Sequence, residues 1–282
     1  MDKNKVAYKL KNLPPIYCIN LDEKVATIMK SGGLCNRIKT MMSALITYEK
    51  IYTEVEADAF IFPNVKLVDE SINPIIDWRL KVSADEENII DDYKTIDFLY
   101  EKIPQHFINK YLKVIEKLEI NSDILDYVND FIKDWDTDIL GVHIRTWYSD
   151  YPRNLWHDNS LFEREIDKFP EDKKIFLCSD NPETIKYFSK KYGDRVMTHP
   201  QKMHDTFVGQ IHLYDQYHND IQLIVDGFID CLLLSKCSDI IGTYVSTFTE
   251  VAWWFGGCKA RVILPKPINY DPSYDDNLFL KK

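Results

Sequence analysis

The chain has 282 residues, of which 45% are hydrophobic and 28% charged, a composition typical of a globular protein with one large or two small domains. Its 35 lysines and arginines are outnumbered by 45 acidic residues, and the net charge of -10 excludes a general nucleic-acid binder with a broad basic face. Only nine glycines are present, so we expect few places where the backbone closely approaches a ligand.

Residues 25–29 form a short apolar run that predicts a strand, and two adjacent glycines follow it. An apolar stripe at helical spacing comes next and predicts a helix that begins near residues 35–36. Residues 57–62 are expected to form another strand, closed by a proline, and residues 85–135 have an irregular helical pattern.

The second half alternates strands with helices. Strands are expected at residues 139–145, 174–180, 195–199, 239–244 and 260–264. Helices are expected to begin at the Asn-Pro pair at 181–182, at about residue 220 and at Ser246. Such alternation implies a parallel, doubly wound sheet, and the first half starts a similar unit. We therefore expect an α/β fold of two Rossmann-like domains, residues 1–137 and 138–282, with a cleft between them.

Cellular location is predicted from absent signals. No stretch reaches the roughly 18 apolar residues of a membrane span, and the lysine-rich start has no apolar secretory region. Six cysteines occur without a CxxC pair, and several lie in apolar runs. They are typical of reduced core thiols rather than of a disulfide or zinc framework, so we expect a cytoplasmic protein with no membrane span.

The glycine turn at residues 31–37 (SGGLCNR) precedes a predicted helix N-terminus. Backbone N–H groups and the helix dipole favour an anion there, although the segment is neither a GxGxxG fingerprint nor a P-loop. A plain corner is as consistent with this pattern as a ligand loop. Arg37 alone is typical of a surface residue, whereas Asn36 beside two glycines is the better candidate for binding.

Polar residues follow several of the predicted strands. His143 and Arg145 alternate at the end of a buried strand, where two polar side chains on one face are costly unless they meet a ligand or an ion pair. Open α/β sheets bind ligands at these carboxyl ends, which favours a functional interpretation. Asp180 follows the next strand and is expected either to cap a helix or to contact a ligand.

Hydroxyl and carboxylate side chains add two further candidates. Ser246 and Thr247 open a helix, and they either cap it or form a phosphate cradle. Asp226 and Asp230 lie within an apolar helical pattern, where a carboxylate needs hydrogen-bond donors, and one edge of a guanine ring offers two.

The acidic segment that contains Asp134, Asp136 and Asp138 resembles the DxD metal motif of some sugar transferases. It lies in a polar stretch just before a strand, where a solvated turn is the more common structure. The histidines show no metal-ligand spacing on a helix. We expect no metal ion and no cofactor.

The motifs GGLCNR, HIR, the SDNP turn and IDCLLLSKCSDIIGTYVSTF, in this order, resemble the GDP-fucose-dependent fucosyltransferase superfamily. That superfamily comprises α1,2-, α1,6- and protein O-fucosyltransferases with a metal-independent GT-B fold. The resemblance spans residues 25–258 as scattered motifs. It implies an inverting glycosyltransferase that transfers fucose from GDP-fucose to a glycan hydroxyl, with the acceptor on the first domain and the donor on the second.

The resemblance also implies roles for single residues. Arg145 would bind the β-phosphate and stabilise the departing GDP, with His143 beside the nucleotide. Asp230 would bind the guanine, and Asn36 would lie over the pyrophosphate and the acceptor. Ser246, Thr247 and Phe248 would hold the diphosphate through hydroxyls and backbone N–H groups. From their positions after predicted strands, Gly32, Gly33 and Asp180 are further candidates for donor binding.

Inverting transfer usually needs a general base, worth roughly 10²–10⁴-fold in rate. Asp150 is the first candidate, with Asp158 and His157 as alternatives, and aromatic residues nearby, such as Trp156, either stack on a sugar or pack internally. Two other functions fit the same motifs. One is transfer of another UDP- or GDP-activated pentose or deoxyhexose, and the other is non-catalytic binding of a nucleotide or glycan.

Overall fold

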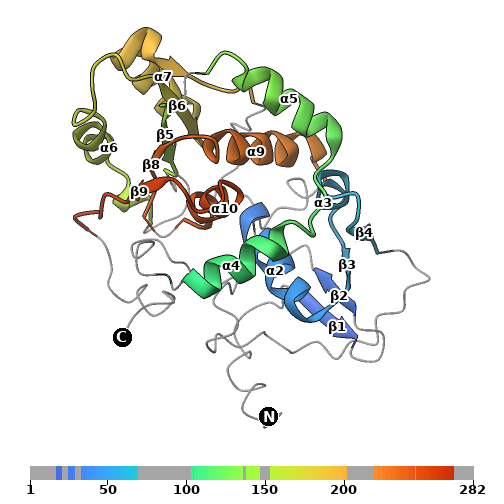
Figure 1. Cartoon of the computed structure of the whole chain (residues 1–282). Helices are drawn as coiled ribbons and strands as arrows, with labels where there is room; N and C mark the ends of the chain where they lie inside the picture. The colour runs from blue at the N-terminus through green and yellow to red at the C-terminus, as the bar shows by residue number, and fades with distance from the viewer. Residues whose placement is uncertain are drawn as a thin grey trace.

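In the part of the chain that the structure describes, two β-sheets are joined by a middle layer of helices (Figure 1). The computed structural model describes residues 17–20, 25–28, 33–68, 103, 105–135, 138–146, 153–201, 219–244 and 246–269.

The first sheet contains short strands in the order β1-β2-β3-β4. β1 runs antiparallel to β2, whereas the other pairs are parallel. The strands are β1 (Tyr17–Asn20), β2 (Val25–Ile28), β3 (Lys50–Thr53) and β4 (Lys66–Leu67). The sheet predicted for this half is therefore parallel except at its edge strand β1, which the sequence did not reveal.

The second sheet is parallel throughout, in the order β7-β6-β5-β8-β9. Its strands are β5 (Leu140–Ile144), β6 (Ile175–Ser179), β7 (Val196–Met197), β8 (Asp239–Ile241) and β9 (Arg261–Ile263). Each lies within a predicted strand, which confirms the α/β class. Strand order reverses between β5 and β8, and ligands of such sheets bind beside that point, outside the carboxyl ends.

The helices follow the strands in the expected alternation. They are α2 (Leu34–Thr47), α3 (Glu56–Ile61), α4 (Gln105–Ile115), α5 (Ser122–Ile132), α6 (Asn159–Ile166), α7 (Pro182–Tyr192), α9 (Ile221–Leu234) and α10 (Thr247–Phe255), with single 3₁₀ turns η2 (Arg153–Trp156) and η3 (Gly193–Arg195). Within the described ranges, none of them combines the length and apolarity needed to cross a bilayer.

Local sequence chemistry places the ends of α7. Asn181 caps the helix by accepting a hydrogen bond at Oδ1 from the Glu183 N–H at 2.9 Å, and Pro182 occupies the first turn. Gly193 ends it with a φ of 57°, which is unfavourable for a residue with a side chain. The cap is thus Asn181, and the alternative that Asp180 caps this helix is wrong.

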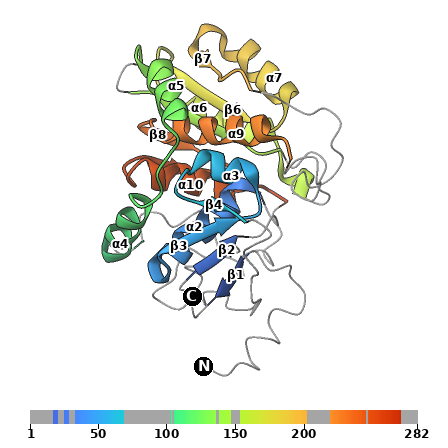
Figure 2. The ribbon, with the colours of Figure 1, turned by 90° about the vertical axis from the view of Figure 1, so that its right-hand side faces the viewer.

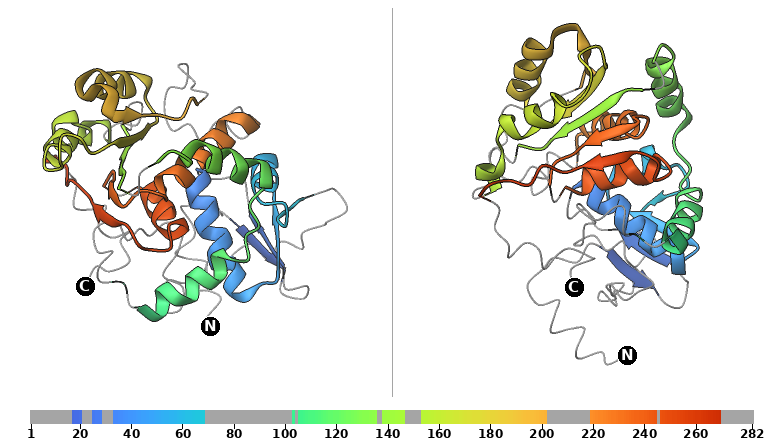
Figure 3. Two further views of the ribbon diagram at one scale, coloured as in Figure 1. Left: turned by 45° about the horizontal axis from the view of Figure 1, so that its top comes forward. Right: turned by 60° about the vertical axis from the view of Figure 1, so that its left-hand side comes forward.

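Helices cover both faces of the second sheet (Figure 2). On one face, α6 and α7 pack against Leu140, Val142 and Ile144 of β5. On the other face, α9 and α10 lie between this sheet and the first half of the chain (Figure 3).

The middle layer joins the two halves. α2 packs against α10 and α3 packs against α9, so helices from the first half meet helices from the second. One continuous core includes Ile28 of the first sheet, Trp254 of α10 and Phe176 of the second sheet. The division into domains at residue 137, and a cleft between them, stay predictions.

The strand predicted at residues 57–62 is wrong, because this segment forms α3. Its buried residues Ala57, Asp58 and Ile61 recur at helical rather than alternating spacing. The strand of this region is β3, just upstream. A short, mostly apolar segment is ambiguous between a strand and a helix, and the nearby proline stops either one.

A buried ion pair ties α3 to α2. Arg37 donates from Nε to Asp58 Oδ2 and from Nη2 to Oδ1, both at 2.7 Å, and neither side chain is exposed. Thr53 at the end of β3 donates its hydroxyl to the same carboxylate at 3.2 Å. Arg37 is therefore a core residue, and the surface position that its sequence context suggested is wrong.

Replacing Asp58 by Ala should destabilise the fold by about 3–5 kcal/mol, because the Arg37 guanidinium would remain buried without its carboxylate. Denaturant unfolding measures this, with Glu56→Ala as a control on an exposed residue of the same helix. Equal, small losses in both variants would contradict the importance of this ion pair.

Candidate functional site

Polar side chains gather at the carboxyl end of β5, beside the point where strand order reverses. His143 and Arg145 occur at alternate positions there, as the sequence predicts. Thr243, just after β8, bridges them: its hydroxyl donates to the His143 carbonyl at 2.9 Å and accepts from the Arg145 N–H at 2.7 Å. Thr243 thus provides hydrogen-bond partners for backbone groups of β5 where its pairing with β8 ends. This role was not predicted from the sequence.

Asp180, at the end of β6, holds the arginine. Its Oδ2 lies 3.0 Å from Arg145 Nη1, and its Oδ1 accepts from the Thr146 N–H at 2.8 Å. The Arg145 side chain is 28% exposed, so this pairing orients the guanidinium while leaving part of it accessible. Asp180 is a partner of Arg145 rather than a helix cap.

His143 is a buried, neutral ring. It stacks on Phe248 with 4.5 Å between ring centroids, and its Nδ1 lies 2.9 Å from the Thr249 hydroxyl. Burial, and secondarily the charge of Arg145, lowers the pKa of His143 to about 3. At neutral pH this imidazole is uncharged and too weakly basic to serve as a general base.

Two helix N-termini meet next to this ring. Asn36, in the first turn of α2, accepts a hydrogen bond at Oδ1 from the hydroxyl of Thr247, the first residue of α10, at 2.8 Å. The N-cap residues are Gly33 for α2 and Ser246 for α10, and neither makes a side-chain cap. The ends of both helix dipoles and their N–H groups therefore suit an anion.

Gly242 permits the close approach of α10 to β8. A Cβ atom at this position would lie 2.3 Å from Thr249 Cγ2 and 2.6 Å from its Oγ1, which is too close for any side chain. Because Thr249 holds His143, a larger residue at position 242 would displace the histidine ring as well.

These contacts bring most of the predicted site residues together. Gly33 and Asn36 lie at the N-terminus of α2, and Ser246, Thr247 and Phe248 lie at the N-terminus of α10. Phe248 stacks on His143 of β5. Arg145, at the end of the same strand, pairs with Asp180. Gly32 and Asp150 lie outside the described residues.

Asp230 lies apart from this group, buried on α9. His199 lies beside it, with Nδ1 3.4 Å from Asp230 Oδ1 but without the alignment of a hydrogen bond. Burial raises the pKa of Asp230 to about 6, with Asp226 adding to the shift and His199 opposing it. The following residue, Cys231, contacts the Phe248 carbonyl at 4.0 Å, whereas Asp230 lies on another side of α9, next to His199.

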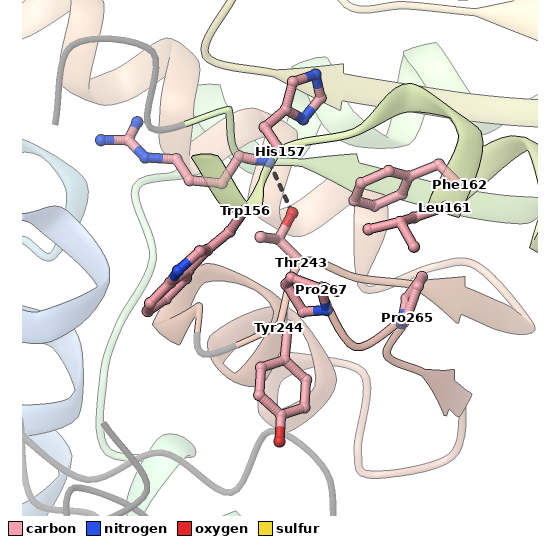
Figure 4. Close-up of a pocket in the computed structure, with 9 residues that line it drawn as sticks. Trp156, His157, Leu161, Phe162, Thr243, Tyr244, Pro265 and Pro267 are labelled. Atoms are coloured by element: carbon pink, nitrogen blue, oxygen red, sulfur yellow. Dashed lines mark hydrogen bonds between the residues drawn. The ribbon is translucent and has the colours of Figure 1, made fainter. Parts of the chain in front are cut away.

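A small pocket opens beside Arg145 on the α6 side of the sheet (Figure 4). Trp156 and Tyr244 line it, but each is nearly fully buried, so these aromatic rings pack within the protein. His157 also lines it, and burial lowers its pKa. The remaining lining residues are Leu161, Phe162, Thr243, Pro265 and Pro267.

Asp158 and Asp138 have structural roles. Asp158 caps α6 by accepting from the Ser160 N–H at 2.9 Å, which lowers its pKa. Asp138 lies just before β5, at the end of the sheet opposite the site, and binds Lys173 Nζ at 2.7 Å. Among the described residues, no cluster of His, Cys, Asp and Glu is arranged to hold a metal ion.

Asp230→Asn should change how stability depends on pH. A pKa raised to about 6 from 3.8 means that Asp230 stabilises the fold below about pH 4 and loses this contribution as the pH rises through 6. Relative to wild type, the variant should gain up to roughly 3 kcal/mol of unfolding free energy between pH 4 and pH 7.5. Denaturant unfolding at both pH values measures the gain.

The control is Asp126→Asn, on the exposed side of α5, which should show no such gain. A constant difference between Asp230→Asn and wild type at both pH values would contradict the raised pKa.

No protein-family model and no curated protein matches the chain. Among solved structures, NodZ α-1,6-fucosyltransferase soaked with GDP-fucose has a TM-score of 0.51 and 16% identity, covering 82% of this chain and 91% of its own. Fucosyltransferase NodZ from Bradyrhizobium has a TM-score of 0.49, 15% identity and coverages of 81% and 91%. POFUT1 in complex with GDP has a TM-score of 0.35 and 12% identity, with coverages of 55% and 49%. The chain therefore has a fold similar to that of an α-1,6-fucosyltransferase, in agreement with the motif resemblance.

Proposed function

We propose that the protein is a metal-independent, inverting glycosyltransferase that transfers fucose from GDP-fucose to a hydroxyl of a glycan. The observation that carries the proposal is the arrangement around Arg145: a cation oriented by Asp180 at the strand reversal, linked through His143 and Phe248 to two uncapped helix N-termini. The fold similarity to a fucosyltransferase soaked with GDP-fucose supports the same function.

The chemistry of this site suits a diphosphate leaving group. Sugar transfer builds negative charge on the departing GDP, and a guanidinium remains charged at every physiological pH. Arg145 would bind the β-phosphate, while the α10 N-terminus at Ser246, Thr247 and Phe248 supplies N–H groups and hydroxyls. Each charge-assisted hydrogen bond contributes about 1.5–3 kcal/mol, and more where it strengthens in the transition state.

The acceptor side needs a proton acceptor. His143 is unsuited, because its pKa of about 3 leaves it a poor base, and Asp158 is committed to the cap of α6. We retain Asp150 as the proposed base. Asn36, at the meeting point of α2 and α10, would lie over the pyrophosphate and the acceptor, with Gly32 and Gly33 beside it.

Guanine recognition is assigned to Asp230. A buried carboxylate with a raised pKa gains most from a ligand that donates hydrogen bonds to it, and the N–H groups along one edge of guanine do so. This assignment distinguishes GDP-sugars from the UDP-activated sugars that the same kind of fold could bind.

Thermal shifts with GDP, UDP and their sugars test the donor. GDP and GDP-fucose should raise the Tm of the wild type, whereas UDP should not, because guanine contributes to binding.

Arg145→Ala should remove the GDP shift and lower fucose transfer by at least about 10²-fold while the fold is retained. Transfer should be unchanged by EDTA.

Arg164→Ala, at an exposed position on α6, is the matched control and should behave as wild type. Near-normal fucose transfer by Arg145→Ala would contradict the proposed site. Binding of GDP without turnover of any donor would point to a non-catalytic relative, and preference for UDP would point to another sugar donor.

A further inference from the structure

The contact between α2 and α10 contains a second buried ion pair. Lys39 Nζ lies 2.8 Å from Glu250 Oε2, and neither side chain has any exposed surface. Trp254 Nε1 donates to the other carboxylate oxygen, Oε1, at 3.4 Å. The two charged residues are 211 positions apart in the sequence, and they connect the helix of the first sheet to a helix of the second.

Such a pair is poorly explained by stability alone. Removing two charges from water is costly, and apolar residues of similar volume often give an equally stable or more stable core. What an ion pair provides, and an apolar contact does not, is a fixed register, because the two charges meet at one relative position of the helices.

The position of the pair indicates which register it fixes. Lys39 comes three residues after Asn36 on α2, and Glu250 comes three residues after Thr247 on α10, so each lies one turn further along the same side of its helix. The Asn36–Thr247 hydrogen bond and the Lys39–Glu250 ion pair therefore form two successive contacts between the helices. A slide of one helix along the other would break both.

We propose that Lys39 and Glu250 are positioning residues, which align the N-termini of α2 and α10 on a single diphosphate. The identity of that anion rests on the proposed function, whereas the alignment does not. Neither residue touches the ligand in this arrangement, because both are fully enclosed one turn behind the site. Their loss would misplace the N–H groups of Thr247 and Phe248 relative to those of α2.

The test compares a neutral and an exchanged pair. Lys39→Met with Glu250→Gln removes both charges and keeps an acceptor for Trp254, so the fold should persist. We expect its affinity for GDP to fall by about tenfold or more, since small misplacements of binding groups are costly. Lys39→Glu with Glu250→Lys restores opposite charges and should recover most of that affinity. Isothermal titration with GDP measures both.

Amide hydrogen exchange gives a readout that needs no ligand. The N–H groups in the second turns of α2 and α10, which are hydrogen-bonded within each helix, should exchange faster in the neutral pair than in wild type, with α7 unchanged. The control is Lys173→Met, which removes a nearly buried lysine at the opposite end of the second sheet and should leave GDP affinity and both second turns unaffected.

Each outcome decides a separate claim. If the neutral pair binds GDP as tightly as wild type, or if the second turns of α2 and α10 exchange at wild-type rates, the positioning role is wrong. If wild type binds no GDP, the proposed donor is wrong, and hydrogen exchange alone decides the alignment. If the neutral pair does not fold, Lys39→Gln with Glu250→Gln replaces it, because these amides can hydrogen-bond to each other without a buried charge, and wild-type GDP affinity in that variant overturns the proposal.

Discussion

The packing of α2 against α10 is the contact on which the rest of the structure depends. It carries one continuous core from the first sheet to the second, and it contains the buried Lys39–Glu250 ion pair. The same contact brings two helix N-termini to the carboxyl edge of the second sheet, next to His143 and Phe248. Stability and the candidate site are therefore built on the same pair of helices.

Binding of an anion by this chain has to be a local effect. The net charge of -10 repels a diphosphate at long range, so attraction must come from groups that contact it directly. Arg145 is such a group, oriented by Asp180 while 28% of its side chain stays exposed. The buried, neutral His143 ring supports Phe248 without adding a competing charge, and the helix dipoles act only within their first turns.

Short sequence patterns predicted many of the strands and helices, whereas features that depend on contacts between distant residues were missed. The strands of the second sheet and the end of α7 at Gly193 were predictable, because they depend on apolar runs and on residues with restricted conformations. The helix α3 was missed, since the burial of Asp58 depends on Arg37, 21 positions away. The His143 and Arg145 pair was found from its alternation, whereas Thr243 was not, because a hydroxyl after a strand has many possible partners.

We propose that one diphosphate binds where α2, α10 and the β5 edge meet. An experimental structure of the protein with GDP tests this most directly. We expect the β-phosphate within hydrogen-bond distance of Arg145 and of N–H groups in the first turn of α10, with the guanine directed towards Asp230. A diphosphate bound elsewhere on the protein, with Arg145 still engaged only by protein groups, would contradict it.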